Sequence, residues 1–240
     1  MLILGATSDI ARAVAHRYAS EGWNIILAGR NIEIIDRDAE DMRVRYKVDV
    51  KVARFEALDF DSHRSFWLQL GEKPDGVLFA IGYLGDQEEC QSEWSQSRVV
   101  LDTNFTSAVS ILNIIARDFE NSGKGFIIGI SSVAGDRGRM SNYIYGSAKA
   151  GFSAYLSGLR NRLSRKGVQV MTVKPGFVAT RMTEGKGLPA SVTASPQQVA
   201  DDIFRAQRRG KPVLYTRWFW KPIMLIIIHL PERIFMKRNL

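Results

Sequence analysis

The sequence predicts one α/β domain of the doubly wound, Rossmann-like kind, with about seven parallel strands and helices on both faces. Short apolar runs alternate with helical periodicity as far as about residue 216. A glycine turn follows the first apolar run and opens a helix, as in dinucleotide-binding folds. A length of 240 residues suits one such domain. Cys90 is the sole cysteine, so we expect no internal disulfide and a reducing compartment.

The first strand is expected at Leu2 to Leu4, followed by a turn and a helix. In such a turn the backbone N–H groups and the helix dipole face a pyrophosphate. Of the three expected glycines only Gly5 is present, and Asp9 and Ala11 replace the others. Asp9 would place a carboxylate near a phosphate unless it caps the helix. An ordinary βα turn is the alternative; the candidate cofactor residues are Gly5, Thr7, Ser8 and Ile10.

A second strand is predicted over Trp23 to Ala28, followed by Gly29, Arg30 and Asn31. An acid at this place would hold a ribose 2′-hydroxyl, whereas an arginine suits a 2′-phosphate. Arg30 therefore favours NADP over NAD as cofactor. The alternative is a solvated loop arginine. Residues 31 to 52 are expected to form a charged surface helix and a turn.

The third strand is predicted over Val52 to Leu58, and a helix over Ser62 to Leu70 with the serine as its N-cap. A fourth, buried strand is expected over Val77 to Ile81. An acid after the third strand could accept from an adenine amino group, and a glycine after the fourth lets backbone approach a ribose. The candidates here are Asp59, Phe60, Ala80 and Gly82.

A long helix is expected from Glu93 to Phe119, with Asn104 among apolar neighbours. That amide either bonds backbone or holds a water that serves a catalytic lysine. Phe126 to Ile130 reads as the fifth strand, and it delivers two serines to its carboxyl end, where ligands of open α/β sheets bind.

The pair Tyr145 and Lys149 lies four residues apart, on one face of a helix. A neighbouring ammonium favours phenolate, so we expect Lys149 to lower the pKa of Tyr145. Ser132 is thirteen residues upstream and could hold the same substrate oxygen; its spacing selects it over Ser131. Alone, a Tyr-x-x-x-Lys pattern is weak. Together Tyr145 would donate the proton, Lys149 would adjust the pKa of the tyrosine, and Ser132 would donate a hydrogen bond to the substrate oxygen.

The sixth strand is expected over Val168 to Val173 and is followed by a turn that could grip a carboxamide. Residues 181 to 195 have no periodicity and read as a mobile lid. A capped helix over Pro196 to Arg209 and a last strand over Pro212 to Thr216 complete the domain. The candidate cofactor residues of the turn are Pro175, Val178 and Thr180.

The net charge of +8 lies in the tail, because residues 205 to 240 hold nine basic residues against Glu232 alone. This distribution argues against a nucleic-acid-binding body. The tail, 217 to 240, joins tryptophans, an apolar run too short to span a bilayer, and basic residues. It either lies in a membrane interface or packs on the sheet or a second subunit. His16, His63 and His229 have no ligand-like spacing, so no metal is expected.

The N-terminus reads as strand from Met1, so we expect no leader peptide and a cytoplasmic chain, with the tail as a peripheral contact at the inner face of the membrane.

These motifs, in this order and spacing, resemble the short-chain dehydrogenase/reductase superfamily over residues 1 to about 216. The resemblance implies an NAD(P)H-dependent enzyme that reduces a ketone, and a homodimer or tetramer paired through its long helices. Tyr145 would be the acid/base, Lys149 would also bind the nicotinamide ribose, Ser132 would hold the carbonyl oxygen, and Asn104 would complete a proton relay. Two departures are the degenerate glycine turn and Phe79 to Gly82, where the superfamily has Asn-Asn-Ala-Gly.

A closer resemblance is to the reductases of decaprenylphosphoryl-2-keto-erythro-pentose. It rests on Leu58 to His63, Leu84 to Glu89, Tyr145 to Gly151 and His229 to Phe235. It implies a lipid-linked ketone as substrate, in cell-envelope arabinose synthesis, and a flavin oxidase as partner. The alternatives are a soluble reductase of acyl or other small ketones and a non-catalytic nucleotide sensor.

Overall fold

The core of the molecule is a parallel β-sheet, and the computed structural model describes residues 1–185 and 187–238. Within these residues the sheet has seven strands, in the spatial order β3-β2-β1-β4-β5-β6-β9. All neighbours run parallel. The predicted doubly wound sheet is thus confirmed. The strands are β1 (Leu2–Leu4), β2 (Ile25–Gly29), β3 (Val50–Arg54), β4 (Gly76–Phe79), β5 (Phe126–Ile130), β6 (Gln169–Pro175) and β9 (Val213–Thr216).

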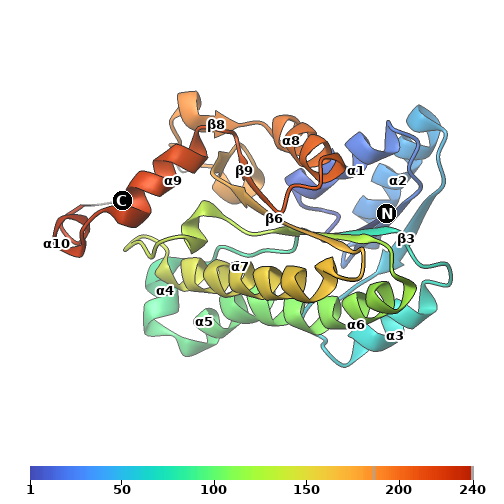
Figure 1. Ribbon diagram of the computed structural model, residues 1–240, viewed down its shortest axis with the longest axis horizontal. Helices are drawn as coiled ribbons and strands as arrows, with labels where there is room; N and C mark the ends of the chain where they lie inside the picture. The colour runs from blue at the N-terminus through green and yellow to red at the C-terminus, as the bar shows by residue number, and fades with distance from the viewer. Residues whose placement is uncertain (186, 239–240) are drawn as a thin grey trace.

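Helices cover both faces of this sheet, which is why its central strands are apolar on both sides (Figure 1). One face packs against α1 (Asp9–Ala19), α2 (Ile32–Tyr46) and α8 (Pro196–Arg208). The other face packs against α3 (Ser62–Gln69), α6 (Ser107–Ser122) and α7 (Tyr143–Ser164), with α4 (Gln87–Ser92) and α5 (Trp94–Leu101) in the same layer.

The strand order reverses at β1, because the chain leaves β1 toward β2 and returns on its other side as β4. In an open parallel sheet this switch opens a crevice at the carboxyl ends of the strands, where ligands bind. The segments after β1, β2, β4, β5 and β6 all emerge at this edge.

The long helix predicted over Glu93 to Phe119 is built from α5, η1 (Asp102–Thr106) and α6. The segment η1 has π-helical geometry, a local widening that is frequent at functional sites. From Trp94 to Ser122 the run is long and apolar enough to cross a membrane by length and composition. Its apolar side packs on α7 and the sheet, which accounts for that composition.

Several strand boundaries differ from the predictions by one or two residues, as in β2, β4 and β6, and the largest difference is at the end of β3. The strand β3 ends at Arg54, four residues before the predicted end. Phe55 and Ala57 continue its alternation because they are buried in the core without belonging to the sheet. The helix α3 begins at Ser62, but its N-cap is Asp61, and no side-chain cap bond forms.

The lid segment and the tail contain short elements. The structure does not describe residue 186. The rest of the segment predicted as a lid contains η3 (Arg181–Thr183), η4 (Ala190–Val192) and β8 (Thr193–Ala194). The strand β8 pairs with β7 (Phe177–Val178). The described part of the tail forms α9 (Trp220–His229) and α10 (Glu232–Phe235), which extend from one end of the body (Figure 1).

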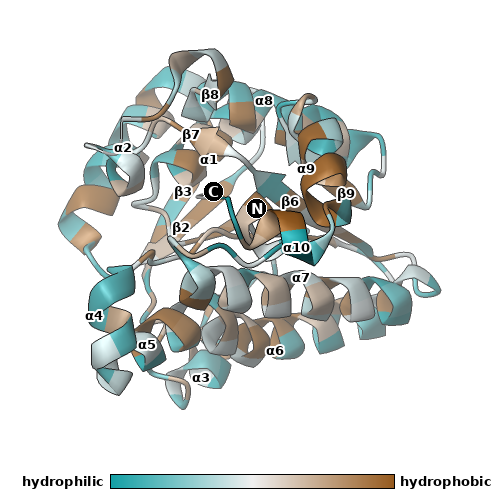
Figure 2. Ribbon diagram, turned by 90° about the vertical axis from the view of Figure 1, so that its left-hand side faces the viewer, coloured by the Kyte–Doolittle hydropathy of each residue, from teal (hydrophilic) through white to brown (hydrophobic). Residues whose placement is uncertain are grey.

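The tail is fastened to the body by its first turn. Trp220 and Met224 are buried against Val133. The indole of Trp220 covers Gly176 so closely that a Cβ there would lie 1.9 Å from a ring atom. Figure 2 shows α9 as a mainly hydrophobic helix beside β9.

Candidate functional site

Two cavities open at the carboxyl edge of the sheet, and they share part of their lining. One measures about 550 Å³ and lies over the glycine turn. The other measures about 790 Å³ and lies over α7. Because they share walls, the two cavities form one continuous cleft. The shared lining includes Ser8, Ile10, Ala80, Gly82 and Thr180.

The glycine turn brings the start of α1 to the first cavity, while the N–H groups of Gly5, Ala6 and Ser8 are bonded to β2 or within the turn. Gly5 has φ +86°, and a Cβ on it would lie 2.9 Å from Ile81, so only glycine brings the chain this close to β4. Ser8 is the N-cap of α1 but makes no side-chain cap bond. The first N–H groups of α1 therefore remain available to an anion, at the positive end of the helix dipole. This donor set fits a pyrophosphate.

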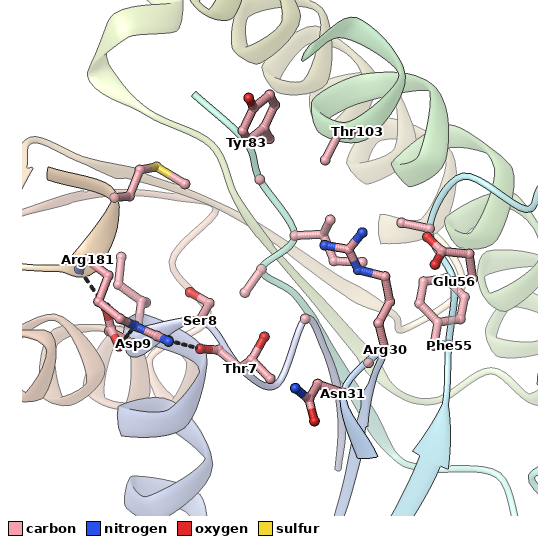
Figure 3. A pocket seen from close by; sticks show the side chains of 18 of the residues that line it. Thr7, Ser8, Asp9, Arg30, Asn31, Phe55, Glu56, Tyr83, Thr103 and Arg181 are labelled. Atoms are coloured by element: carbon pink, nitrogen blue, oxygen red, sulfur yellow. Dashed lines mark hydrogen bonds and ion pairs between the residues drawn. The ribbon is translucent and has the colours of Figure 1, made fainter. Parts of the chain in front are cut away.

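The Asp9 carboxylate does not cap α1, so of the two expected possibilities it is the carboxylate beside the phosphate turn that the structure has. Instead it accepts two hydrogen bonds from Arg181, one from its backbone N–H (2.8 Å) and one from Nε (3.1 Å). The Nη2 of Arg181 also donates to the carbonyl of Thr7. Figure 3 shows Arg181 lying across the turn from the lid side. The guanidinium therefore neutralises the carboxylate that stands where a glycine was expected.

At the far end of the first cavity, Arg30 extends beside Phe55 and Glu56 (Figure 3). Its placement in the cavity wall fits a contact with the ribose end of a cofactor. Asp59 and Phe60 come directly after residues that line this cavity, and their contact with a cofactor stays a prediction. Because β3 ends at Arg54, the loop of residues 55 to 58 forms this wall, and the two predicted residues pass into the turn before α3.

The second cavity contains the polar residues predicted for catalysis. Ser132 follows β5, and its Oγ accepts from the N–H of Ala134 (3.1 Å). Tyr145 and Lys149 come from the first turns of α7, and all three line the cavity. Ser131 instead faces α7, where its hydroxyl bonds the Lys149 carbonyl (3.0 Å) and Ser153 (2.7 Å). Both serines line the cavity, but the Ser131 hydroxyl is already bonded to α7, which leaves Ser132 as the serine that can donate to a substrate.

Burial dominates the titration of the tyrosine and the lysine. Burial raises the pKa of Tyr145 to about 12, against a lowering by the Ser132 hydroxyl. Burial also lowers the pKa of Lys149 to about 7. Its Nζ donates to the Ile130 carbonyl (3.1 Å) and lies 5.7 Å from the centre of the tyrosine ring. The predicted lowering of the tyrosine pKa by Lys149 is therefore wrong for this state, because desolvation disfavours both charged forms.

Asn104 is fully buried and does not line either cavity. Its Nδ2 donates to the carbonyls of Tyr83 (2.6 Å) and Val100 (2.8 Å), and its Oδ1 accepts from the N–H of Tyr83 (3.2 Å). Of the two possibilities expected from the sequence, hydrogen bonds to backbone or to a water near the lysine, the Asn104 side chain makes the bonds to backbone. It fixes the loop after β4 against η1, at Gly82, where a Cβ would lie 3.1 Å from Oδ1 and 3.4 Å from the Nζ of Lys149.

The turn after β6 reaches the cleft from the other side. Pro175, Val178 and Thr180 all line the second cavity. Thr180 is the N-cap of η3, and its hydroxyl pairs with that of Thr183 in a capping box. Gly82 and Gly5 leave open the space that a side chain would fill, so the cleft as a whole fits a dinucleotide. Among the residues described, no group of three His, Cys, Asp or Glu could hold a metal ion.

Several cleft residues were not predicted from the sequence. Arg181 and Arg139 lie in segments without periodicity, and Glu56 lies in the alternating run predicted as the third strand. Only the tertiary fold brings these three residues to the cleft. Gln87 and Asn142 stand near the first residues of α4 and α7. A position at the start of a helix is the one signal that could have pointed to these two.

The comparisons with known proteins agree with this geometry. The family model for short chain dehydrogenase matches residues 1–189. An uncharacterized oxidoreductase of Mycobacterium tuberculosis is 34% identical over 235 residues, covering 97% of this chain and 94% of that protein. A sulfoacetaldehyde reductase of Chromohalobacter salexigens is 28% identical over 216 residues, covering 85% and 80%. A short-chain dehydrogenase from Sphingobium yanoikuyae in complex with NADPH has the same fold, with TM-score 0.82, 22% identity and 96% of each chain covered.

Proposed function

Because this chain belongs to the short-chain dehydrogenase family and is an NAD(P)-dependent oxidoreductase, we propose that it reduces a ketone to a secondary alcohol at Ser132, Tyr145 and Lys149. One observation carries this proposal. The three side chains line one cavity, and that cavity shares a wall with the pyrophosphate turn. A substrate in it would meet the reacting end of a bound dinucleotide.

The bound cofactor supplies the hydride to the carbonyl carbon. The chain supplies the proton and holds the oxygen. Tyr145 keeps its proton at neutral pH, since its pKa is about 12, so its hydroxyl is a ready acid for an oxygen that is gaining negative charge. Ser132 donates to the same oxygen. Lys149, with a pKa of about 7, can return a proton to the tyrosine. Asn104 acts as a positioning residue for the loop beside that lysine.

NADPH is the proposed cofactor in preference to NADH. Arg30 stands in the wall of the first cavity at the end of β2, where a planar guanidinium suits a 2′-phosphate. The opposing feature is Glu56 in the same wall. Its carboxylate favours unphosphorylated ribose, so the preference depends on how closely Arg30 approaches the ribose.

The proposed substrate is the 2-keto group of a polyprenyl-phosphate-linked pentose, in a sequence shared with a flavin oxidase. The sequence resemblance in four segments supports this assignment. A second candidate is a small acidic carbonyl compound, because one relative reduces sulfoacetaldehyde. A non-catalytic sensor would not need Ser132, Tyr145 and Lys149 in one cavity.

The proposed assembly is a homodimer or tetramer in the cytoplasm, with the tail against an anionic membrane surface. Leu225 and Ile226 of α9 are 60% and 66% exposed, although both are apolar. Basic residues flank the helix, and the 205–240 segment holds nine of them against one acid. Exposed apolar side chains beside cations are the arrangement that binds a lipid interface.

Purified full-length protein tests the catalytic proposal. We expect it to oxidise NADPH, faster than NADH, with a 2-keto sugar derivative as acceptor. Tyr145→Phe should still bind NADPH, measured by cofactor fluorescence, yet lose at least about two orders of magnitude in kcat, the usual contribution of a positioned acid. Tyr155→Phe on the outer part of α7 is the matched control. Near-normal turnover by Tyr145→Phe would refute the assignment.

A further inference from the structure

Three buried polar groups in the second cavity have no partner. Within the described residues, Nε of Arg139, Nε2 of Gln87 and Oδ1 of Asn142 are shielded from water and make no hydrogen bond. All three residues line the cavity that contains Ser132 and Tyr145. Buried polar groups are normally paired, and each unpaired one costs free energy. Three in one cavity indicate that a ligand completes them.

Arg139 is the most informative of the three, because its neighbour Arg137 shows what a satisfied arginine in this loop looks like. Arg137 donates to the carbonyls of Ile227 (2.5 Å) and Leu230 (2.7 Å) and pairs with Glu232 (2.8 Å). The one contact of the Arg139 guanidinium to a side-chain acceptor, in the described part of the chain, is Nη2 to the thioether of Met224 (3.4 Å). A sulfur is a weak acceptor for a cation.

In the part of the chain that the structure describes, no carboxylate forms an ion pair with Arg139, whereas Arg137 pairs with Glu232. Asp136, an acid whose charge acts on Arg139, is occupied by Lys174 and by the Tyr215 hydroxyl (2.8 Å). The acids of the cavity wall are also engaged or solvated. Asp86 caps α4 through the N–H groups of Glu88 and Glu89, and Glu88 is exposed. Burial lowers the pKa of Arg139, which is the cost of a cation removed from water without an anion.

We propose that Arg139 binds an anionic oxyacid group of the substrate, a phosphate or sulfonate, while Gln87 and Asn142 bind hydroxyl groups next to the reacting carbonyl. The inference rests on the proposed function, and it names the substrate class: a hydroxylated ketone that carries an oxyanion. Arginine suits this role because its planar fork matches the oxygens of a phosphate. One amide donor and one amide acceptor suit a hydroxyl, which both donates and accepts.

The position of Arg139 also fixes how the substrate lies. The loop from Ser132 to Asn142 carries the oxygen holder at one end and the arginine near the other. The same loop packs on the tail through Val133 and Met224. A substrate held by both ends of this loop would have its oxyanion on the side of α9. A lipid phosphate could therefore enter from the tail side, and a free sugar phosphate could bind in the same place.

Binding of unreactive alcohols tests this inference without turnover. Titration calorimetry on the full chain should give glycerol 3-phosphate a Kd at least about tenfold below that of glycerol, the usual gain from a charge-assisted hydrogen bond. In Arg139→Gln this difference should vanish, and in Arg139→Lys, which keeps the charge without the fork, it should be partly retained. The control is Arg64→Gln, on the exposed side of α3, which should bind as the wild type does.

Equal binding of glycerol 3-phosphate by the wild type and Arg139→Gln, with unchanged circular dichroism, would overturn the inference. If Arg139→Gln does not fold, Arg139→Lys takes its place in the test. The inference is then overturned when this variant binds glycerol 3-phosphate as the wild type does and the wild type binds glycerol and glycerol 3-phosphate with equal Kd values. Farnesyl phosphate separates the two sources: a Kd about tenfold below that of glycerol 3-phosphate indicates a lipid-linked substrate. A chain that binds phosphate but never oxidises NADPH would refute the proposed function and leave this inference standing.

Discussion

Replacing Lys149 with methionine should remove a pH dependence of stability that burial creates. The side chain is 3% exposed, and its pKa falls from 10.5 to about 7 on folding. Between these two values the unfolded chain binds a proton that the folded chain lacks. The free energy of unfolding of the wild type therefore rises with pH across this window. Below pH 7 both states are protonated and this contribution is absent.

The magnitude follows from the width of the window. Each pH unit adds about 1.4 kcal/mol, so the full contribution approaches roughly 5 kcal/mol by pH 10.5. Urea unfolding of the wild type and Lys149→Met at pH 7, 8, 9 and 10 measures it, because other titrating groups are shared and cancel in the difference. The free energy of unfolding of the wild type should increase relative to that of the variant with each rise in pH. Two parallel stability curves would refute the claim that this lysine is desolvated in the folded chain.

Two further predictions concern Arg181 and the tail. Arg181→Gln removes the cation from Asp9 and leaves its bond to the backbone N–H of residue 181. The uncompensated charge beside the pyrophosphate turn should raise the Kd for NADPH about fivefold, within the range of a partly exposed ion pair, and Asp9→Gly in the same chain should restore it. The Kd is measured by the fluorescence of bound NADPH, and a double variant that binds no tighter than the single one contradicts the pairing. The full chain should float with phosphatidylglycerol vesicles. The double variant Leu225→Gln, Ile226→Gln should reduce flotation several-fold, whereas Leu68→Gln, at an equally exposed leucine on α3, should not. Equal flotation of the wild type, the double variant and Leu68→Gln argues against membrane docking.

The sheet and its helices could be predicted because strands buried on both faces appear in the sequence as short apolar runs, and the helices between them show helical periodicity. The end of β3 could not be predicted, and the reason is physical. Phe55 and Ala57 are buried like strand residues, yet they belong to a loop that fills the core beside α3. Apolar alternation reports burial and does not report hydrogen bonding in a ladder.

The catalytic candidates show the same division between spacing and environment. Spacing alone places Tyr145 and Lys149 on one side of α7, and it selects Ser132. The titration of these groups depends on how much water the fold removes, which spacing does not contain. The fold excludes enough water from these two side chains to raise the pKa of Tyr145 and to lower that of Lys149. A lysine near neutrality is better suited to passing protons than to acting as a fixed cation.

The acid in the phosphate turn is the departure that sequence reasoning could least resolve, and the structure gives it a physical account. Asp9 and Arg181 are 172 residues apart in the chain, so no local pattern joins them. Their pairing replaces a neutral glycine with a neutral ion pair, which keeps the electrostatic field at the turn close to what a pyrophosphate requires. It also ties the first residue of the lid to the cofactor turn. A cofactor phosphate that attracted the Arg181 guanidinium would weaken its hydrogen bond to the Asp9 carboxylate, because the two anions compete for one cation.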